Sequence, residues 1–215
     1  MGMKRDRALE TILATKVIAV IRMKDPERLF EVTEALKKGG VKALEITMTV
    51  PGALDIIQRL AGAKPEGLLI GAGTVLDADT AAAAIWSGAD FVVSPVADPG
   101  MISACRAHDT FVAPGAFTPT EIVAAWDRGA DMVKVFPATS LGPQYFRDLK
   151  GPFPQLRLMP TGGVTVENAR EFIAAGASAV GIGTALVDRK TVEAGDWEAL
   201  TARTRRLVES LGGLP

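Results

Sequence analysis

The chain alternates along its whole length between short β-branched runs and longer segments whose apolar residues recur at helical spacing. One helical segment is residues 26–38, where Leu29, Val32 and Leu36 fall on one face. Strict alternation of this kind predicts parallel strands with helices packed outside them. The predicted strands are residues 17–22, 43–47, 68–72, 91–94, 110–113, 132–136, 157–160 and 179–183. Eight such units within 215 residues predict an α/β fold, a small (β/α)8 TIM barrel.

Capping residues mark the ends of the predicted helices. Asp25-Pro26 and Thr118-Pro119 each place a cap before a proline at the first helical position, and Glu121 completes a capping box with Thr118. Glycines with positive φ are predicted to end helices at positions 39–40, 62, 88, 129 and 176. No linker or low-complexity tract divides the chain, so we expect a single barrel domain over residues 1–215, with an extra N-terminal helix over residues 5–14. A doubly wound open sheet is the alternative architecture.

The composition excludes several classes of function. Lys plus Arg total 24 and Asp plus Glu total 25, a near-neutral balance that provides no long-range field for a nucleic acid. The single cysteine, Cys105, and the single histidine, His108, argue against disulfides, His-rich zinc sites and Ser-His-Asp triads. We find no signal peptide and no apolar stretch near the roughly 20 residues that a membrane span needs. We therefore expect a cytoplasmic protein with no nucleic-acid or membrane partner.

A short repeat places four residues at equivalent points in the predicted barrel. Glycines at 40, 88, 129 and 176 precede alternate strands, and five residues after each glycine come Glu45, Val93, Lys134 and Gly181. Alternate strands of a barrel contribute the side chains of one interior layer. Because strand side chains alternate between faces, the apolar neighbours of Glu45 and Lys134 should point to the helices and these two should point inward. The repeat predicts that Glu45 and Lys134 approach each other inside the barrel, with Gly181 leaving room for a ligand.

A lysine and a glutamate inside a barrel are costly unless pairing or function offsets their desolvation. They could form a buried ion pair that only fixes the core. Alternatively, Lys134 could form a Schiff base while Glu45 moves protons. Burial lowers the pKa of a lysine and a nearby carboxylate raises it, and the sequence leaves open which effect dominates.

Two glycine clusters follow the last two strands. Thr161, Gly162 and Gly163 come after the seventh strand, and Gly183 and Thr184 come after the eighth. In barrels these two loops commonly bind phosphate through backbone N–H groups and a helix N-terminus, for which Thr165 is a suitable cap. The alternative is a pair of tight turns. Neither cluster matches a dinucleotide or ATP motif, so no such cofactor is expected.

Two further rim positions are candidates for binding an anion. Thr74 follows glycines at the end of the third strand and offers a hydroxyl and an N–H to a small carboxylate. Arg22 ends the first strand and is either an anion ligand or part of a rim salt bridge.

At these residues the chain resembles the bacterial aldolases for 2-keto-3-deoxy-6-phosphogluconate (KDPG) and 4-hydroxy-2-oxoglutarate (KHG). The matching stretches are Ile18-Ala-Val-Ile-Arg22, Leu44-Glu-Ile-Thr47, Gly71-Ala-Gly-Thr-Val75, Ser94-Pro95, Val133-Lys-Val-Phe-Pro-Ala138 and Pro160-Thr-Gly-Gly-Val164. The resemblance extends from about residue 8 to about residue 210. It implies that Lys134 is the Schiff-base residue and Glu45 the proton-transfer residue. The substrate-binding residues it implies, with Arg22 added from its position, are Arg22, Thr47, Thr74, Pro95, Phe136, Thr161, Gly162, Gly163, Gly183 and Thr184.

The resemblance implies a homotrimer that cleaves a small 2-keto acid without cofactor or metal, because a protonated imine is itself an electron sink. KDPG is the first substrate expected, and KHG is the alternative. Many members carry an arginine four residues after the catalytic glutamate, where this chain has Thr49, so Arg22 is expected to supply the charge. A phosphosugar isomerase or epimerase and a non-catalytic phosphate-binding barrel are the more distant alternatives.

Overall fold

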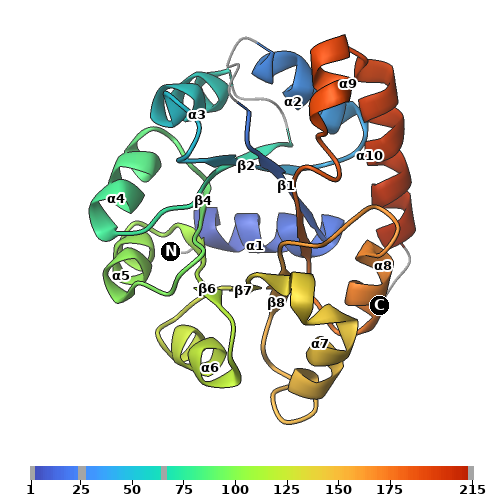
Figure 1. Cartoon of the computed structure of the whole chain (residues 1–215). Helices are drawn as coiled ribbons and strands as arrows, with labels where there is room; N and C mark the ends of the chain where they lie inside the picture. Colours follow the sequence, from blue (N-terminus) through green and yellow to red (C-terminus); the bar gives the residue numbers. More distant parts are fainter. Residues whose placement is uncertain (1–2, 24–27, 64–66, 213–215) are drawn as a thin grey trace.

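The computed structural model describes residues 3–23, 28–63 and 67–212. Strands and helices alternate along the chain, and the helices surround a ring of strands (Figure 1). The strands are β1 (Val17–Ile21), β2 (Ala43–Thr47), β3 (Leu69–Gly73), β4 (Phe91–Val93), β5 (Phe111–Ala113), β6 (Gly115–Ala116), β7 (Val133–Val135), β8 (Leu158–Pro160) and β9 (Val180–Ile182). The helices are α1 (Met3–Thr15), α2 (Leu29–Lys38), α3 (Ala53–Gly62), α4 (Ala78–Trp86), α5 (Pro99–Ala107), α6 (Pro119–Asp127), the 3-10 helix η1 (Ala138–Ser140), α7 (Gly142–Lys150), α8 (Ala169–Ala174), α9 (Arg189–Ala194) and α10 (Trp197–Leu211).

The parallel strands form a closed ring. One sheet has the order β5-β4-β3-β2-β1-β9 and the other has the order β6-β7-β8. A bridge between Thr161 and Gly181 joins β8 to β9, and the chain itself joins β5 to β6 through Pro114. The predicted (β/α)8 barrel is therefore confirmed, and the doubly wound sheet is excluded.

The fifth predicted strand is followed by a second short strand that was not predicted. The strand expected over residues 110–113 is confirmed as β5, which pairs with β4, whereas the separate β6 pairs with β7. Pro114 lies between them and has no N–H to donate, although its carbonyl oxygen still accepts from the Lys134 N–H at 2.9 Å. The interruption therefore leaves Lys134 bonded to the fifth strand.

Helix α1 closes the N-terminal end of the barrel and lies across the centre of the ring (Figure 1). Its buried Ala8 and Ile12 belong to the same apolar cluster as Phe91 and Phe111 on the strands and Met132 directly before β7. The Lys4 ammonium donates to the Ala89 carbonyl at 2.8 Å, and Arg5 Nε lies 2.5 Å from the Asp131 carboxylate. The extra helix predicted over residues 5–14 is confirmed and lasts one to two residues longer at each end.

Two apolar layers enclose the strands. Leu44, Ile46, Val133 and Val135 belong to the outer cluster, between strands and helices. Their positions confirm the predicted alternation on β2 and β7. Within the described part of the chain, no helix is long and apolar enough to cross a membrane.

Most of the predicted helix ends are confirmed. Thr118 and Glu121 form the expected capping box, and positive φ occurs at Gly40, Gly88, Gly129 and Gly176. α3 ends at Gly62 as predicted, but Gly62 does not adopt the predicted positive φ, because it is still the last helical residue and Ala63 caps the helix. The predicted cap at residues 25–26 lies outside the described residues.

Candidate active site

Glu45 and Lys134 both lie inside the barrel. Glu45 is the middle residue of β2 and pairs in register with Val20 and Gly71, while Lys134 is the middle residue of β7. The exposed fractions of the two residues are 1% and 3%. Ala43 and Met132, two residues before Glu45 and Lys134, belong to the inner apolar cluster, as strand alternation requires. The predicted inward direction of the two side chains is therefore confirmed.

The two charged groups influence each other without forming an ion pair. Among the described residues, the Glu45 carboxylate oxygens have no hydrogen-bond partner, and no lysine nitrogen lies within 4.0 Å of them. Burial raises the pKa of Glu45, opposed by the charges of Lys134 and Arg22. Burial lowers the pKa of Lys134, opposed by Glu45 and reinforced by Arg22. Desolvation thus dominates at both groups and favours their neutral forms.

A neutral lysine amine is a nucleophile, and a carboxyl group with a raised pKa can both accept and donate a proton near neutral pH. The question left open by the sequence is answered here: at Lys134, burial outweighs the nearby carboxylate. Lys134 Nζ also lies 5.0 Å from the centre of the Phe136 ring, two residues along the chain.

Glycines on neighbouring strands make space for the polar side chains. A Cβ atom on Gly73 would lie 1.8 Å from Glu45 Oε1, and one on Gly181 would lie 2.3 Å from Thr161 Oγ1. The buried Thr161 hydroxyl has no hydrogen-bond partner in the described chain. The space beside Gly181 was predicted to be free for a ligand, but the Thr161 hydroxyl takes part of it.

A hollow of about 240 Å³ opens at the carboxyl end of the barrel, above β8 and β9. It brings together seven of the predicted substrate-binding residues, namely Arg22, Phe136, Thr161, Gly162, Gly163, Gly183 and Thr184. Thr47, Thr74 and Pro95 do not line it, but they lie at or just after the ends of β2, β3 and β4, on the same end of the barrel.

Thr47, Thr74 and Pro95 differ in their side-chain contacts, backbone conformation and burial. The buried Thr47 hydroxyl lies 2.8 Å from the Thr49 hydroxyl, so the residue that replaces the expected arginine is bonded to the end of β2. Thr74 has a φ of 59°, a left-handed conformation that is rare for a β-branched residue and is typical of functional turns. Pro95 is half-buried, and its carbonyl lies against Gly115.

Asn168, which we did not predict, organises the loop after β8. Its side-chain amide donates to the Gly163 carbonyl at 2.9 Å, and its side-chain oxygen accepts from the Thr165 N–H at 2.8 Å. Thr165 was predicted to cap the following helix, but α8 begins only at Ala169, and the Thr165 hydroxyl instead accepts from the Asn168 N–H at 3.3 Å. The spacing Thr-x-x-Asn resembles a capping box, and it is the sequence signal that could have identified Asn168.

The loop glycines present their backbone to the hollow. Gly162 and Gly163 have φ values of 87° and 75°, and Gly163 packs so closely on Thr139 that a Cβ would lie 2.8 Å from Thr139 Cα. We find no described residue that accepts a hydrogen bond from the N–H of Gly162, Gly163 or Thr184. These donors are free to bind an anion.

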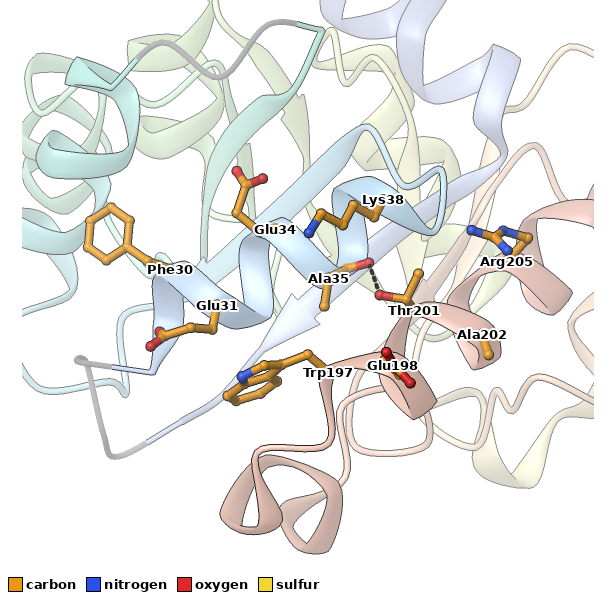
Figure 2. A pocket seen from close by; sticks show the side chains of 10 residues that line it. All are labelled: Phe30, Glu31, Glu34, Ala35, Lys38, Trp197, Glu198, Thr201, Ala202 and Arg205. Carbon is orange, nitrogen blue, oxygen red and sulfur yellow. Dashed lines mark hydrogen bonds between the residues drawn. The ribbon is translucent and has the colours of Figure 1, made fainter.

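A larger hollow, of about 620 Å³, lies elsewhere. It is a groove between α2 and α10 where Phe30 and Trp197 stand among charged side chains, and Thr201 donates to the Ala35 carbonyl at 3.1 Å (Figure 2). It lies between two helices outside the ring of strands and contains none of the residues at the strand ends, so we do not assign the chemistry to it.

The single cysteine and the single histidine lie at the C-terminal end of α5. Cys105 is buried, and burial raises the pKa of its thiol to about 12. The His108 ring lies 6.4 Å from that of Trp86 in an edge-to-face arrangement. No group of three or more metal-ligating side chains occurs in the described ranges.

Similarity to known proteins extends over most of the chain. The family model for KDPG and KHG aldolase matches residues 9–203. A 2-dehydro-3-deoxy-phosphogluconate aldolase from Pseudomonas aeruginosa is 36% identical over 196 residues, which cover 90% of this chain and 88% of that protein. The KHG/KDPG aldolase of Escherichia coli K12 is 35% identical over 202 residues, which cover 93% of this chain and 94% of that protein.

Two solved structures are also similar to this chain. A KDPG aldolase from Legionella pneumophila, with pyruvate captured at low pH as a covalent carbinolamine intermediate, has a TM-score of 0.85 and 28% identity, covering 93% of this chain and 97% of that chain. A protein cage designed by fusing symmetric oligomeric domains has a TM-score of 0.83 and 29% identity, covering 91% of this chain and 71% of that chain.

Proposed function

Because the chain belongs to the KDPG and KHG aldolase family, we propose that it cleaves KDPG to pyruvate and glyceraldehyde 3-phosphate through a Schiff base on Lys134. The observation that carries this proposal is the buried pair of Lys134 and Glu45, whose pKa values are both shifted toward the neutral forms below the mouth of a barrel. The same chemistry on KHG, giving pyruvate and glyoxylate, is the second candidate, since one relative carries both names.

Each step follows from the chemistry of the two groups. The neutral amine of Lys134 attacks the C2 ketone, and the Glu45 carboxyl donates its proton to the departing hydroxyl, so that loss of water leaves a protonated imine and a Glu45 carboxylate. Glu45, directly or through a water, takes the proton of the C4 hydroxyl. The C3–C4 bond then breaks, its electron pair flows into the imine, and the aldehyde leaves. Protonation of the enamine at C3 and hydrolysis of the imine release pyruvate and restore the amine, so the reaction needs no metal.

The rim residues are assigned to the two ends of the substrate. We assign the pyruvate carboxylate to Thr74 and the guanidinium of Arg22, with Thr47, Pro95, Phe136 and Thr161 lining the pocket. Arg22 is close enough to affect the pKa values of both Lys134 and Glu45, which supports a position over the reacting carbons. We assign the terminal phosphate to the free backbone donors of Gly162, Gly163 and Thr184, with Gly183 beside them.

The test measures pyruvate release from KDPG and from KHG. Two or three charge-assisted hydrogen bonds to phosphate should favour KDPG by about 30- to 1,000-fold in kcat/KM. Equal efficiency on both substrates would transfer the assignment to KHG. An isomerase, an epimerase or a non-catalytic barrel would release no pyruvate and would form no pyruvate adduct on reduction with borohydride.

Replacing Gly183 with Ala should remove most of this preference. Gly183 lines the hollow, and an added Cβ would meet only Val20, at 3.6 Å or more, so the fold should be kept. The methyl group should obstruct the phosphate and lower kcat/KM for KDPG by about tenfold or more, while the value for KHG changes less than about threefold. Gly62→Ala, in open space on α3, is the matched control. A uniform loss on both substrates would contradict the phosphate assignment.

We also propose that the chain acts in the cytoplasm as a single-domain homotrimer. Support for symmetric assembly comes from the designed cage of oligomeric domains and from an apolar rim patch, defined as Leu76, Val96 and Phe117, which are 52%, 46% and 39% exposed. These residues belong to successive loops, after β3, β4 and β6. Backbone bonds tie the first two loops to the neighbouring strands, from the Val75 N–H to the carbonyl of Val93 on β4 and from the N–H of Gly115 on β6 to the Val96 carbonyl.

Placing charges on the rim patch should dissociate the trimer. Val96→Asp combined with Phe117→Asp would bury two carboxylates in an apolar interface, a cost of several kcal/mol. We expect light scattering to give the monomer mass, with an unchanged circular dichroism spectrum. Trp86→Asp, at the most exposed large apolar side chain and outside the patch, should leave the trimer intact. A trimer that survives the double substitution would place the interface elsewhere.

A further inference from the structure

A second hollow, of about 380 Å³, adjoins the proposed active site and is not used by the reaction above. The two hollows share Arg22 and Thr184 as lining residues, so they meet at the rim above β1 and β9. The rest of the second hollow is formed by Met23, Val187, Arg189, Val192 and Glu193.

The walls of this second hollow combine an apolar surface with an excess of positive charge. Val187 and Val192 are 9% and 8% exposed and supply apolar contact together with Met23. Two guanidinium groups, those of Arg22 and Arg189, face one carboxylate, that of Glu193.

The carboxylate pairs with one of the two guanidinium groups and leaves the hollow with an excess of one positive charge. Arg189 Nε donates to Glu193 Oε1 at 2.6 Å, and the two side chains are 88% and 60% exposed. Such an exposed pair contributes little to stability, and the Arg189 guanidinium keeps further N–H donors for a second anion. This hollow therefore suits an apolar chain that ends in an anion.

Helix α9, which forms one wall, is held in place from both sides. Arg28 donates to the carbonyls of Val192 and Glu193 at 2.5 and 3.0 Å. Arg203 donates to the Leu186 carbonyl at 2.9 Å and also bonds the Asp188 carboxylate. A wall fixed by such contacts does not need to be ordered by the ligand, and this lowers the cost of binding.

We propose that the second hollow is an acceptor subsite for aldehydes with an apolar stem and a terminal anion, and that Arg189 determines this specificity. The inference rests on the proposed aldolase function. In the synthetic direction the enamine of pyruvate on Lys134 attacks the aldehyde carbon, forming the C3–C4 bond, and the aldehyde oxygen takes a proton from Glu45. Hydrolysis of the resulting imine consumes the water that was released when pyruvate bound to Lys134, so the net reaction joins pyruvate and the aldehyde into one 4-hydroxy-2-keto acid. A six-carbon aldehyde acid would extend from the reacting carbon past Thr184 to Arg189.

The experiment measures aldol addition of pyruvate to glyceraldehyde 3-phosphate, 6-oxohexanoate and hexanal. The parent enzyme should use 6-oxohexanoate about tenfold more efficiently than hexanal, the gain expected from one charge-assisted contact. Arg189→Gln should remove that advantage and leave the other two aldehydes unchanged. Val192→Phe should reduce turnover of both six-carbon aldehydes relative to glyceraldehyde 3-phosphate by filling the hollow. Lys190→Gln, an exposed charge outside the hollow, is the matched control.

The outcomes separate the two proposals. If glyceraldehyde 3-phosphate reacts but 6-oxohexanoate does not, or if Arg189→Gln and Lys190→Gln behave alike, the subsite is overturned and the aldolase function stands. If no aldehyde adds to pyruvate, the proposed function fails and the subsite fails with it.

Discussion

Replacing Lys134 with Met should reduce KDPG cleavage to less than about one ten-thousandth of the parent rate, since loss of a nucleophile removes the whole covalent pathway. The methionine fills a similar volume and needs no solvation, so the fold should be retained. In the parent, borohydride with pyruvate should add one reduced three-carbon group, and peptide mapping should place it on Lys134. The variant should take up none.

Lys42→Met is the matched control, because Lys42 is an exposed lysine directly before β2. It should retain both cleavage and labelling. A pyruvate adduct on any lysine other than Lys134, or cleavage that persists in Lys134→Met, would disprove the imine assignment.

Replacing Glu45 with Gln should lower kcat by about 10²- to 10⁴-fold, the usual effect of removing a group that transfers protons. The amide has nearly the same shape as the carboxyl but cannot take the C4 hydroxyl proton. Pyruvate release under saturating KDPG measures the effect. A kcat near the parent value would show that another group or a water moves this proton.

Although Glu45→Gln should lower kcat, it should raise the free energy of unfolding. Burial raises the pKa of Glu45 above its ordinary value of 4.5. Above pH 4.5 the unfolded chain releases this proton while the folded chain still holds it, so the free energy of unfolding of the parent falls as the pH rises toward the folded pKa. Glu45→Gln lacks this loss and should gain stability relative to the parent between pH 5 and pH 8, as urea denaturation would show. Glu34→Gln, on the exposed face of α2, should change neither kcat nor this pH dependence.

The barrel was predictable because its signals are local. The period-two alternation of β2 and β7 is a property of each strand alone, and it correctly placed Glu45 and Lys134 inside. The break of the fifth strand at Pro114 was not predicted, because a short extended segment after a proline carries no pattern of its own. It becomes a strand only through pairing with β7.

The loops of the site were less predictable because their contacts join distant residues. Nothing in the local sequence indicates that Gly163 packs on Thr139 or that Asn168 bonds the Gly163 carbonyl. The balance of pKa effects at Lys134 likewise depends on burial and on the positions of Glu45 and Arg22, which only the folded barrel provides. Sequence patterns thus identified which charged side chains point into the barrel, while the structure supplies their contacts and their electrostatic state.

The N-terminal helix closes one end of the barrel. Since α1 covers that end with Ala8, Ile12 and the buried inner cluster, the described structure leaves the carboxyl end of the barrel as the route for substrate, products and the water of hydrolysis. Under the proposed mechanism, use of one route by all these molecules sets the order of aldehyde release and imine hydrolysis. The aldehyde occupies the route to the imine until it departs, so hydrolysis follows its release and the enamine is shielded from premature quenching. A helix that makes no contact with the substrate thereby governs the sequence in which the two products leave.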